Sequence, residues 1–314
     1  MSTVAAYAAF IGFVLAMLVV DLKFFHSEAK PPSTKDSAIW TVVWILLSIA
    51  FGAGIYYVKG PTVAAEYFSG YLLEKALSVD NMFVFLVIFS YFSVKSDYQH
   101  RVLFFGILGA IVFRGIFIAL GNTLIHRFEW IVYAFGALLL YTAYRIARGA
   151  AEEVHPEHNP VLKLFQRHFR TTSRYHGHKL FAVENGKRVA TPLFVVLLIV
   201  ETTDIVFAVD SIPAIFAITR DPFIVLTSNV FAILGLRALY FLLAGSVDRF
   251  HLLKYGLGII LAFVGVKMLL SDVWHPPIAL SLGVIAGVLA ITSVASLMIT
   301  PKHERVASEA SPPS

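Results

Sequence analysis

Long apolar runs constrain this chain more than any other feature, because about 20 consecutive apolar residues form one helical crossing of a bilayer. The sequence contains nine such runs, and 58% of its 314 residues are hydrophobic while only 14% are charged. Soluble domains carry roughly a quarter charged residues, so this composition excludes a water-soluble globular enzyme and a disordered regulator. The expected spans are Val4–Phe24, Ala38–Val58, Ala64–Phe92, Val102–Gly121, Trp130–Arg148, Thr191–Ile218, Phe223–Gly245, Leu252–Leu270 and Pro277–Ile299.

The distribution of Lys and Arg predicts the orientation, because loops that face the cytoplasm carry an excess of both. With the N-terminus outside, eighteen of the 25 Lys and Arg residues fall in inner segments, three in outer segments and four within spans. We therefore predict an all-α integral membrane protein of about nine transmembrane helices, N-out and C-in. The net charge of +5 then reflects basic loops near anionic lipid and does not indicate a nucleic-acid partner. The chain contains no Cys, which excludes disulfides and thiolate metal sites.

The one long connection, residues 149–190, is expected to be a basic cytoplasmic loop with two ordered parts. Pro160–Arg170 alternates apolar and basic residues, which predicts an interfacial helix with its cations toward lipid headgroups. Further on, the Asn185-Gly186 dipeptide predicts the two-residue turn of a β-hairpin. The tail, residues 300–314, ends in SEASPPS and is expected to be disordered.

Two parts of the sequence resemble each other, which predicts an internal repeat. Residues 64–148 and 191–272 would form two copies of three helices each within a single transmembrane domain, 1–314. Because three is odd, the copies must enter the membrane from opposite sides, which is typical of alternating-access transporters. The alternatives are a chance match of apolar segments and an old duplication without transport. The matched positions are Glu74 with Asp204, Asp80 with Asp210, Asn81 with Ser211, Arg114 with Arg237 and Gly136 with Gly258.

Charged side chains within the expected spans must face protein or an aqueous cavity, because each would cost about 3 kcal/mol near the bilayer centre. The two acids of each copy are six positions apart, which corresponds to a rotation of about 240° along a helix, so a continuous helix cannot bind one ion with both. Either the helix is interrupted between them, as Pro213 favours in the second copy, or each acid faces a different neighbour. The charged residues are Glu74, Lys75, Asp80, Arg114, Glu201, Asp204, Asp210, Arg237 and Lys267, with Asp21 as a further candidate near the end of the first span.

Bringing the two copies together would place Asp80 next to Asp210, with Asn81, Ser211 and Asn229 nearby. Oxygen ligands without thiolate suit Mg²⁺, Ca²⁺ or Mn²⁺. Because adjacent carboxylates repel one another, protons could replace the metal, which gives a physical route to cation/proton exchange. The alternative is structural: the acids would pair with Lys75, Arg114 and Arg237 to hold the helices together. These cations could also act as gates.

Four stretches of the sequence resemble the TerC family, and more closely its Alx-type branch, within the LysE-like transporter superfamily. The resemblance rests on LEKALSVDN, NGKRVATPL, VETTDIVFAVDSIPAIFAIT and SNVFAILGLRALYFLL and extends over residues 67–270. It implies a protein of the bacterial inner membrane that moves divalent metal, principally Mn²⁺, out of the cytoplasm. The motif acids of the family fall on Glu74, Asp80, Glu201, Asp204 and Asp210, and its motif asparagines on Asn81 and Asn229.

We therefore expect a carrier and not an enzyme, with Mn²⁺ as transported substrate, protons as a candidate counter-ion and no tightly bound organic cofactor. Its expected partners are the metal ion and the lipid bilayer. One alternative is a non-transporting membrane scaffold in a metal or tellurite stress complex. Another is a transporter of Ca²⁺ or a different divalent cation, since hard cations accept similar oxygen ligands.

Overall fold

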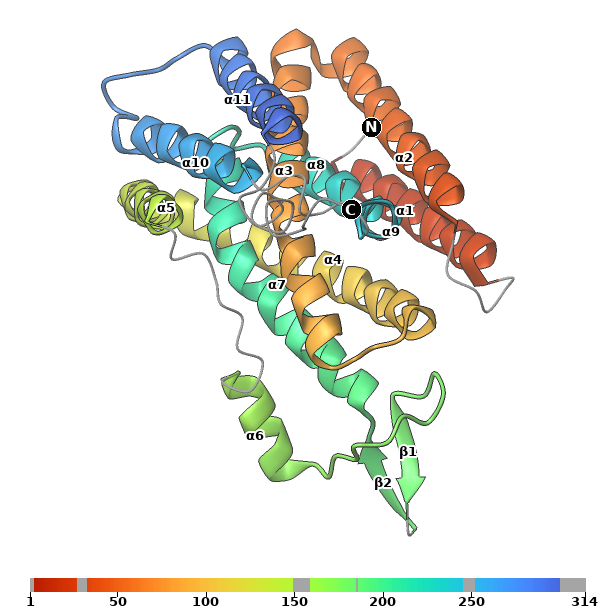
Figure 1. The fold of residues 1–314 in the computed structure, drawn as a ribbon. Helices are drawn as coiled ribbons and strands as arrows, with labels where there is room; N and C mark the ends of the chain where they lie inside the picture. Colours follow the sequence, from red (N-terminus) through yellow and green to blue (C-terminus); the bar gives the residue numbers. More distant parts are fainter. Residues whose placement is uncertain (1–2, 27–32, 149–158, 185, 245–251, 300–314) are drawn as a thin grey trace, which may run out of the picture.

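The computed structural model describes residues 3–26, 33–148, 159–184, 186–244 and 252–299, and gives only the backbone of residues 3, 21–26, 80, 83 and 160. Within these residues the regular secondary structure is helical except for one short β-hairpin (Figure 1). The elements are α1 (Thr3–His26), α2 (Thr34–Lys59), α3 (Pro61–Tyr91), α4 (Ser96–Arg127), α5 (Ile131–Ala147), α6 (Pro160–His168), β1 (Phe181–Glu184), β2 (Lys187–Ala190), α7 (Pro192–Phe216), α8 (Pro222–Leu234), α9 (Leu236–Leu243), α10 (Leu253–Leu269) and α11 (Ile278–Met298).

Five helical segments of the described residues are long and apolar enough to cross a membrane: α2, α4, α7, α8 continued by α9, and α11. Val4–Val20 and Ile131–Ala147 are shorter apolar helices. The chain is therefore an all-α, multi-pass membrane protein, as its apolar runs predict. The charge-bearing helix α3 packs against α2, α7, α8 and α11. Its acidic residues can consequently face protein instead of lipid.

The helices of residues 64–148 pack against those of residues 191–272 in a pattern that is unchanged when the two sets are exchanged. Helix α3 packs on α8, α4 on α7, and α5 on α10. Close contacts follow the same rule. A Cβ added to Gly136 in α5 would lie 3.0 Å from the carbonyl oxygen of Gly265 in α10. A Cβ added to Gly258, the counterpart of Gly136, would lie 3.2 Å from Cγ2 of Ile146 in α5.

The contact between α5 and α10 should be sensitive to a single methyl group. A Cβ on Gly265 would lie 3.0 Å from the carbonyl oxygen of Gly136, a backbone atom that cannot rotate away. We expect Gly265→Ala to lower the free energy of unfolding by about 1–3 kcal/mol, measured by unfolding of the purified protein in detergent. Gly115→Ala in α4 is the matched control, because nothing lies within 4 Å of its added Cβ. Equal losses in the two variants would contradict this contact.

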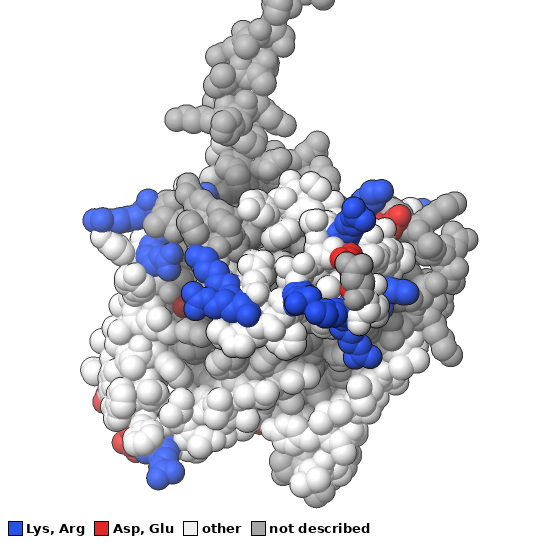
Figure 2. Space-filling model, turned by 90° about the horizontal axis from the view of Figure 1, so that it is seen from below, with Lys and Arg blue, Asp and Glu red and all other residues white. Residues whose placement is uncertain are grey.

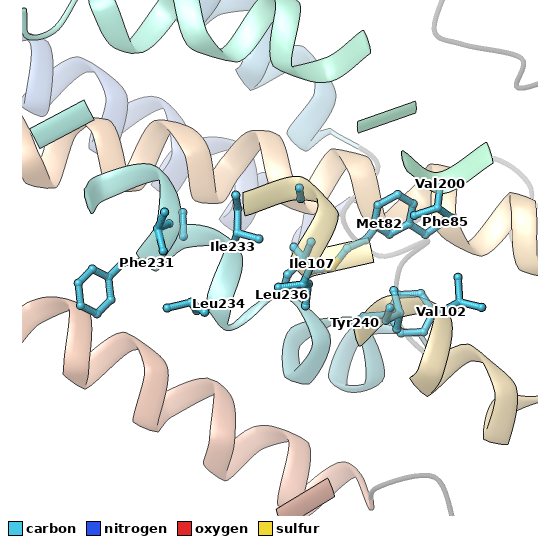
Figure 3. Close-up of a cluster of buried hydrophobic side chains, with 14 of the residues drawn as sticks. Met82, Phe85, Val102, Ile107, Val200, Phe231, Ile233, Leu234, Leu236 and Tyr240 are labelled. Atoms are coloured by element: carbon cyan, nitrogen blue, oxygen red, sulfur yellow. The ribbon is translucent and has the colours of Figure 1, made fainter. Parts of the chain in front are cut away.

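An apolar cluster fills the space between α3, α4, α7, α8 and α9 (Figure 3). Met82 and Phe85 enter it from α3, Ile107 from α4, and Val200 from α7, and all of these side chains are buried. Leu236 of α9 is also buried and lies beside Ile107. Asp204 of α7 is buried and lies beside Phe85, Ile107, Val200 and Leu236 of this cluster, so this acid has an apolar environment.

Of the two alternatives for the paired acids, the structure does not have the helix interruption. Both α3 and α7 are continuous across their acidic residues, and α7 contains Pro213 only in its last turn. Pro213 removes a single helical N–H, the one that would donate to the carbonyl of Val209, and α7 continues past it to Phe216. A break occurs instead inside the predicted span Phe223–Gly245, where Gly235 separates α8 from α9.

Both ordered parts predicted for the long loop are confirmed. Helix α6 (Pro160–His168) forms, and β1 pairs antiparallel with β2. Gly186 has a φ of 75°, as the turn requires. Figure 1 shows α6 and the hairpin at the end of α7 where that helix begins, beyond the bundle. Residues 149–158, Asn185 and the predicted tail, 300–314, lie outside the described residues.

Candidate functional site

The two repeat-matched acids of α7, Asp204 and Asp210, face different neighbouring helices, as the rotation along a continuous helix requires. Asp204 contacts Arg114 of α4, whereas Asp210 accepts a hydrogen bond of 2.9 Å from Thr142 of α5. Of the two alternatives drawn from the sequence, the second therefore describes this helix. The acids of α7 do not form a single chelating pair.

An ion-paired triad joins equivalent acids of the two copies. The guanidinium of Arg114 donates from Nε and Nη2 to the two carboxylate oxygens of Asp204, at 3.2 and 2.9 Å. Its Nη1 pairs with Oε1 of Glu74 in α3. Glu74 is 0% exposed, Arg114 2% and Asp204 6%. Two carboxylates thus share one cation, which leaves a formal charge of −1 in a site shielded from water.

Glu201 adds a further carboxylate one turn before Asp204. It packs against Gly109 of α4, where an added Cβ would overlap the carboxylate group. Oxygen Oε2 of Glu201 is buried and has no hydrogen-bond partner in the described part of the protein. Residues three apart share a helix face, so Glu201 lies on the same face of α7 as Asp204.

Neutral oxygen and nitrogen groups near these helices also lack partners. Asn229 of α8 is 0% exposed, and neither its Oδ1 nor its Nδ2 has a hydrogen bond to another described residue. The same holds for Oγ of Ser211 in α7. Asn81 of α3 is buried. Buried polar atoms without partners cost free energy, so these groups are suited to bind something that the folded chain alone does not supply.

The remaining predicted cations have other surroundings. Nζ of Lys75 donates to the carbonyl oxygen of Ala232 at 3.1 Å, in the last turn of α8 before the break at Gly235. It therefore caps a helix end within the membrane-embedded part of the chain. Arg237 of α9 lies 6.0 Å from the ring centre of Phe104 in α4. Nζ of Lys267 donates to Ser281 of α11.

Two predicted site residues have backbones that the structure describes and side chains that it does not. Asp80 lies in α3 and Asp21 in α1. The expected approach of Asp80 to Asp210 therefore stays a prediction. Among the side chains that are described, no three His, Asp or Glu residues converge as a metal site would require.

Little space surrounds the triad. A cavity of about 10 Å³ adjoins Asp204, lined mainly by apolar residues that include Phe85, Ile107, Val200 and Leu236. That volume suffices for roughly one water molecule. A hydrated cation would therefore reach the triad only after the surrounding helices move apart.

A larger and more polar cavity of about 430 Å³ lies at the other end of α7 from the hairpin. Glu66, Arg220, Lys267 and His275 contribute to its wall. Oε2 of Glu66 accepts a hydrogen bond of 2.6 Å from Thr219. In the predicted orientation this cavity opens toward the outer side of the membrane.

Sequence reasoning did not select several residues that shape the site. Thr142 binds Asp210, Gly109 makes room for Glu201, and Gly235 divides α8 from α9. Of these three residues, only Thr142 could have been recognised from the sequence, because it is a polar residue within an apolar span. The roles of the two glycines depend on which helix lies opposite, and the sequence alone does not specify that.

Comparisons with known proteins agree with the family resemblance. A family model described as "Integral membrane protein TerC family" matches residues 59–304. A protein of Escherichia coli (strain K12) named "Putative membrane-bound redox modulator Alx" is 47% identical over 301 residues, which cover 93% of this chain and 94% of the relative. An "Uncharacterized membrane protein STKORF319" of Myxococcus xanthus is 48% identical over 292 residues, 93% of this chain and 92% of the relative. No solved structure matches the chain.

Proposed function

Because the chain belongs to the TerC family of integral membrane proteins, we propose that it exports a divalent metal cation from the cytoplasm, with Mn²⁺ as the cargo. The protein acts as a carrier, and the metal is its substrate. The main support is the triad of Glu74, Arg114 and Asp204, in which equivalent acids of two helical copies share one buried cation.

The proposal includes an inverted repeat of three-helix copies within about nine spans, N-out and C-in. The exchange-symmetric packing of α3 on α8, α4 on α7, and α5 on α10 supports it. So does the excess of Lys and Arg in the segments assigned to the cytoplasm. Such repeats place a substrate site near the midplane, where the copies meet.

In this mechanism Arg114 is the internal counter-charge of the empty carrier. A divalent cation that enters between Glu74 and Asp204 replaces the guanidinium. Its two positive charges balance both carboxylates, whereas Arg114 balances only one. The unpartnered groups of Glu201, Asn229 and Ser211 are oxygen donors of the type that Mn²⁺ accepts. When the metal leaves, Arg114 balances one carboxylate again and a proton neutralises the other, which couples metal release to proton uptake.

A second function, that of a non-transporting scaffold, is favoured by a different aspect of the same triad. Arg114 already neutralises half of the charge of Glu74 and Asp204, and no described set of three acidic or His side chains converges. In that case the ion pairs only hold α3, α4 and α7 together. A thiol-based redox role, which the name of the Alx relatives could suggest, has no residue to perform it, because these 314 residues contain no Cys.

Mn²⁺ flux in liposomes that contain only this purified protein tests the proposal directly. We expect metal-dependent flux above that of protein-free liposomes, with a dependence on the pH gradient or on the membrane potential. Competition by Ca²⁺ and Mg²⁺ in the same assay reports the selectivity. No flux under any pH or voltage condition would reject transport and favour the scaffold.

A further inference from the structure

One face of the molecule is strongly basic and plays no part in the proposed transport. Figure 2 views the protein from the end that carries α6 and the hairpin, and Lys and Arg side chains gather on this face while Asp and Glu are sparse. Residues 159–184 and 186–190 contain a single acid, Glu184. Their basic residues are Lys163, Arg167, Arg170, Arg174, Lys179, Lys187 and Arg188.

A groove of about 510 Å³ separates the end of α6 from the hairpin, and its wall includes Arg167, Arg170 and Lys187. These three side chains form no ion pair with any other described residue. Glu184, the carboxylate of the groove, accepts hydrogen bonds from Nε2 of His176 at 2.8 Å and Oγ1 of Thr172 at 3.0 Å. These bonds hold the pKa of Glu184 below its usual range. The groove therefore contains three cations and one carboxylate, and Oε1 of that carboxylate already accepts two hydrogen bonds.

The ring of Phe194 connects both walls of this groove to the beginning of a candidate membrane span. Phe194 lies in the first turn of α7, a helix that is apolar and long enough to cross the bilayer. Its ring centre lies 5.1 Å from that of Phe165 in α6 and 4.5 Å from that of Phe181 in β1. Both walls of the groove therefore pack against the start of this span, which is where we expect the lipid headgroups.

Large apolar side chains are exposed beside these cations. Leu164 of α6 and Phe169, just after it, are each 57% exposed, and Val183 of β1 is 67% exposed. Exposed apolar residues next to Lys and Arg are typical of segments that lie in a membrane interface. A soluble anion would use the cations and leave the apolar residues in water.

We propose that the groove between α6 and the hairpin binds the headgroup of an anionic phospholipid in the leaflet that α6 faces. Arg167, Arg170 and Lys187 bind the phosphate through charge-assisted hydrogen bonds. Leu164, Phe169 and Val183 lie against the start of the acyl chains. The bound lipid then connects the hairpin to the first turn of α7.

The test is a lipid titration of the delipidated, full-length protein in detergent, followed by native mass spectrometry. Phosphatidylglycerol and phosphatidylcholine are the two probes. We expect the wild type to prefer phosphatidylglycerol by about tenfold or more. The triple variant Arg167→Gln, Arg170→Gln, Lys187→Gln should lose most of that preference.

A matched variant outside the groove wall, Lys163→Gln, Lys179→Gln, Arg188→Gln, removes the same charge from the same loop. It should keep most of the preference, because none of these residues lines the groove. Equal losses in the two triple variants would overturn the proposal in favour of diffuse attraction. Displacement of the lipid by excess inorganic phosphate would overturn it in favour of a soluble anion. The single variant Lys187→Gln, at an exposed position, gives the same comparison if the triple variant does not fold.

Discussion

Asp210→Asn should reduce Mn²⁺ flux through the reconstituted protein by about 100-fold, to near background, without preventing membrane insertion. The substitution removes the negative charge but keeps an oxygen that can accept the hydrogen bond of Thr142. Loss of transport would then reflect the charge and not the fold. Liposome flux and the growth of manganese-loaded cells measure the effect.

Asp80→Asn should behave in the same way, since Asp80 occupies the matched position of the first copy. Asp36→Asn is the control, because Asp36 is an exposed acid in the first turn of α2, far along the chain from both motifs. If both motif variants protected manganese-loaded cells as well as the parent, the assigned residues would not bind the cargo.

Arg114→Gln should leave Glu74 and Asp204 buried without a cation and should destabilise the protein by about 3–5 kcal/mol in the absence of metal. If the triad is a carrier site, Mn²⁺ supplies the missing positive charge. We therefore expect added Mn²⁺ to restore much of the lost stability in the variant and to stabilise the wild type far less, since Arg114 occupies the site there. Thermal unfolding in detergent, with and without Mn²⁺, measures both effects.

Lys75→Gln provides the matched comparison for this experiment. Like Arg114, Lys75 is a cation within a helix of the bundle. It lies in α3 and binds the carbonyl oxygen of Ala232 instead of a carboxylate. Its loss should destabilise the protein without creating a metal-dependent rescue. If Mn²⁺ rescued neither variant, the triad would be a structural ion pair, as the scaffold hypothesis requires.

Much of the fold could be predicted from the sequence, because lipid imposes simple rules on each segment. The expected span Ala64–Phe92 agrees closely with α3 (Pro61–Tyr91), and the expected span Thr191–Ile218 with α7 (Pro192–Phe216). The amphipathic pattern before Arg170 and the Asn-Gly turn predicted α6 and the hairpin correctly. Helix ends were less accurate. Helix α4 runs from Ser96 to Arg127 and extends beyond its apolar centre, because polar residues near a membrane surface can continue a helix at little cost.

The candidate site was only partly predictable. The acids of the motifs were identifiable because a charge within an apolar run is costly and needs a reason. The residues that pair with these acids were not identifiable from the sequence. Arg114 is 90 residues from Asp204 in the chain, and nothing in the local sequence indicates that it pairs with Asp204 and Glu74 at once.

By itself the sequence determined that this chain crosses a membrane repeatedly, which of its loops are basic, and which acids are carried to lipid depth. These properties follow from the hydrophobicity and charge of each segment alone. Only the tertiary structure decided that Arg114 binds two acids, that Asp210 turns to Thr142, and that the broken helix lies at Gly235 instead of Pro213. Such contacts depend on distances of a few ångströms between helices far apart in the chain, and packing alone determines those distances.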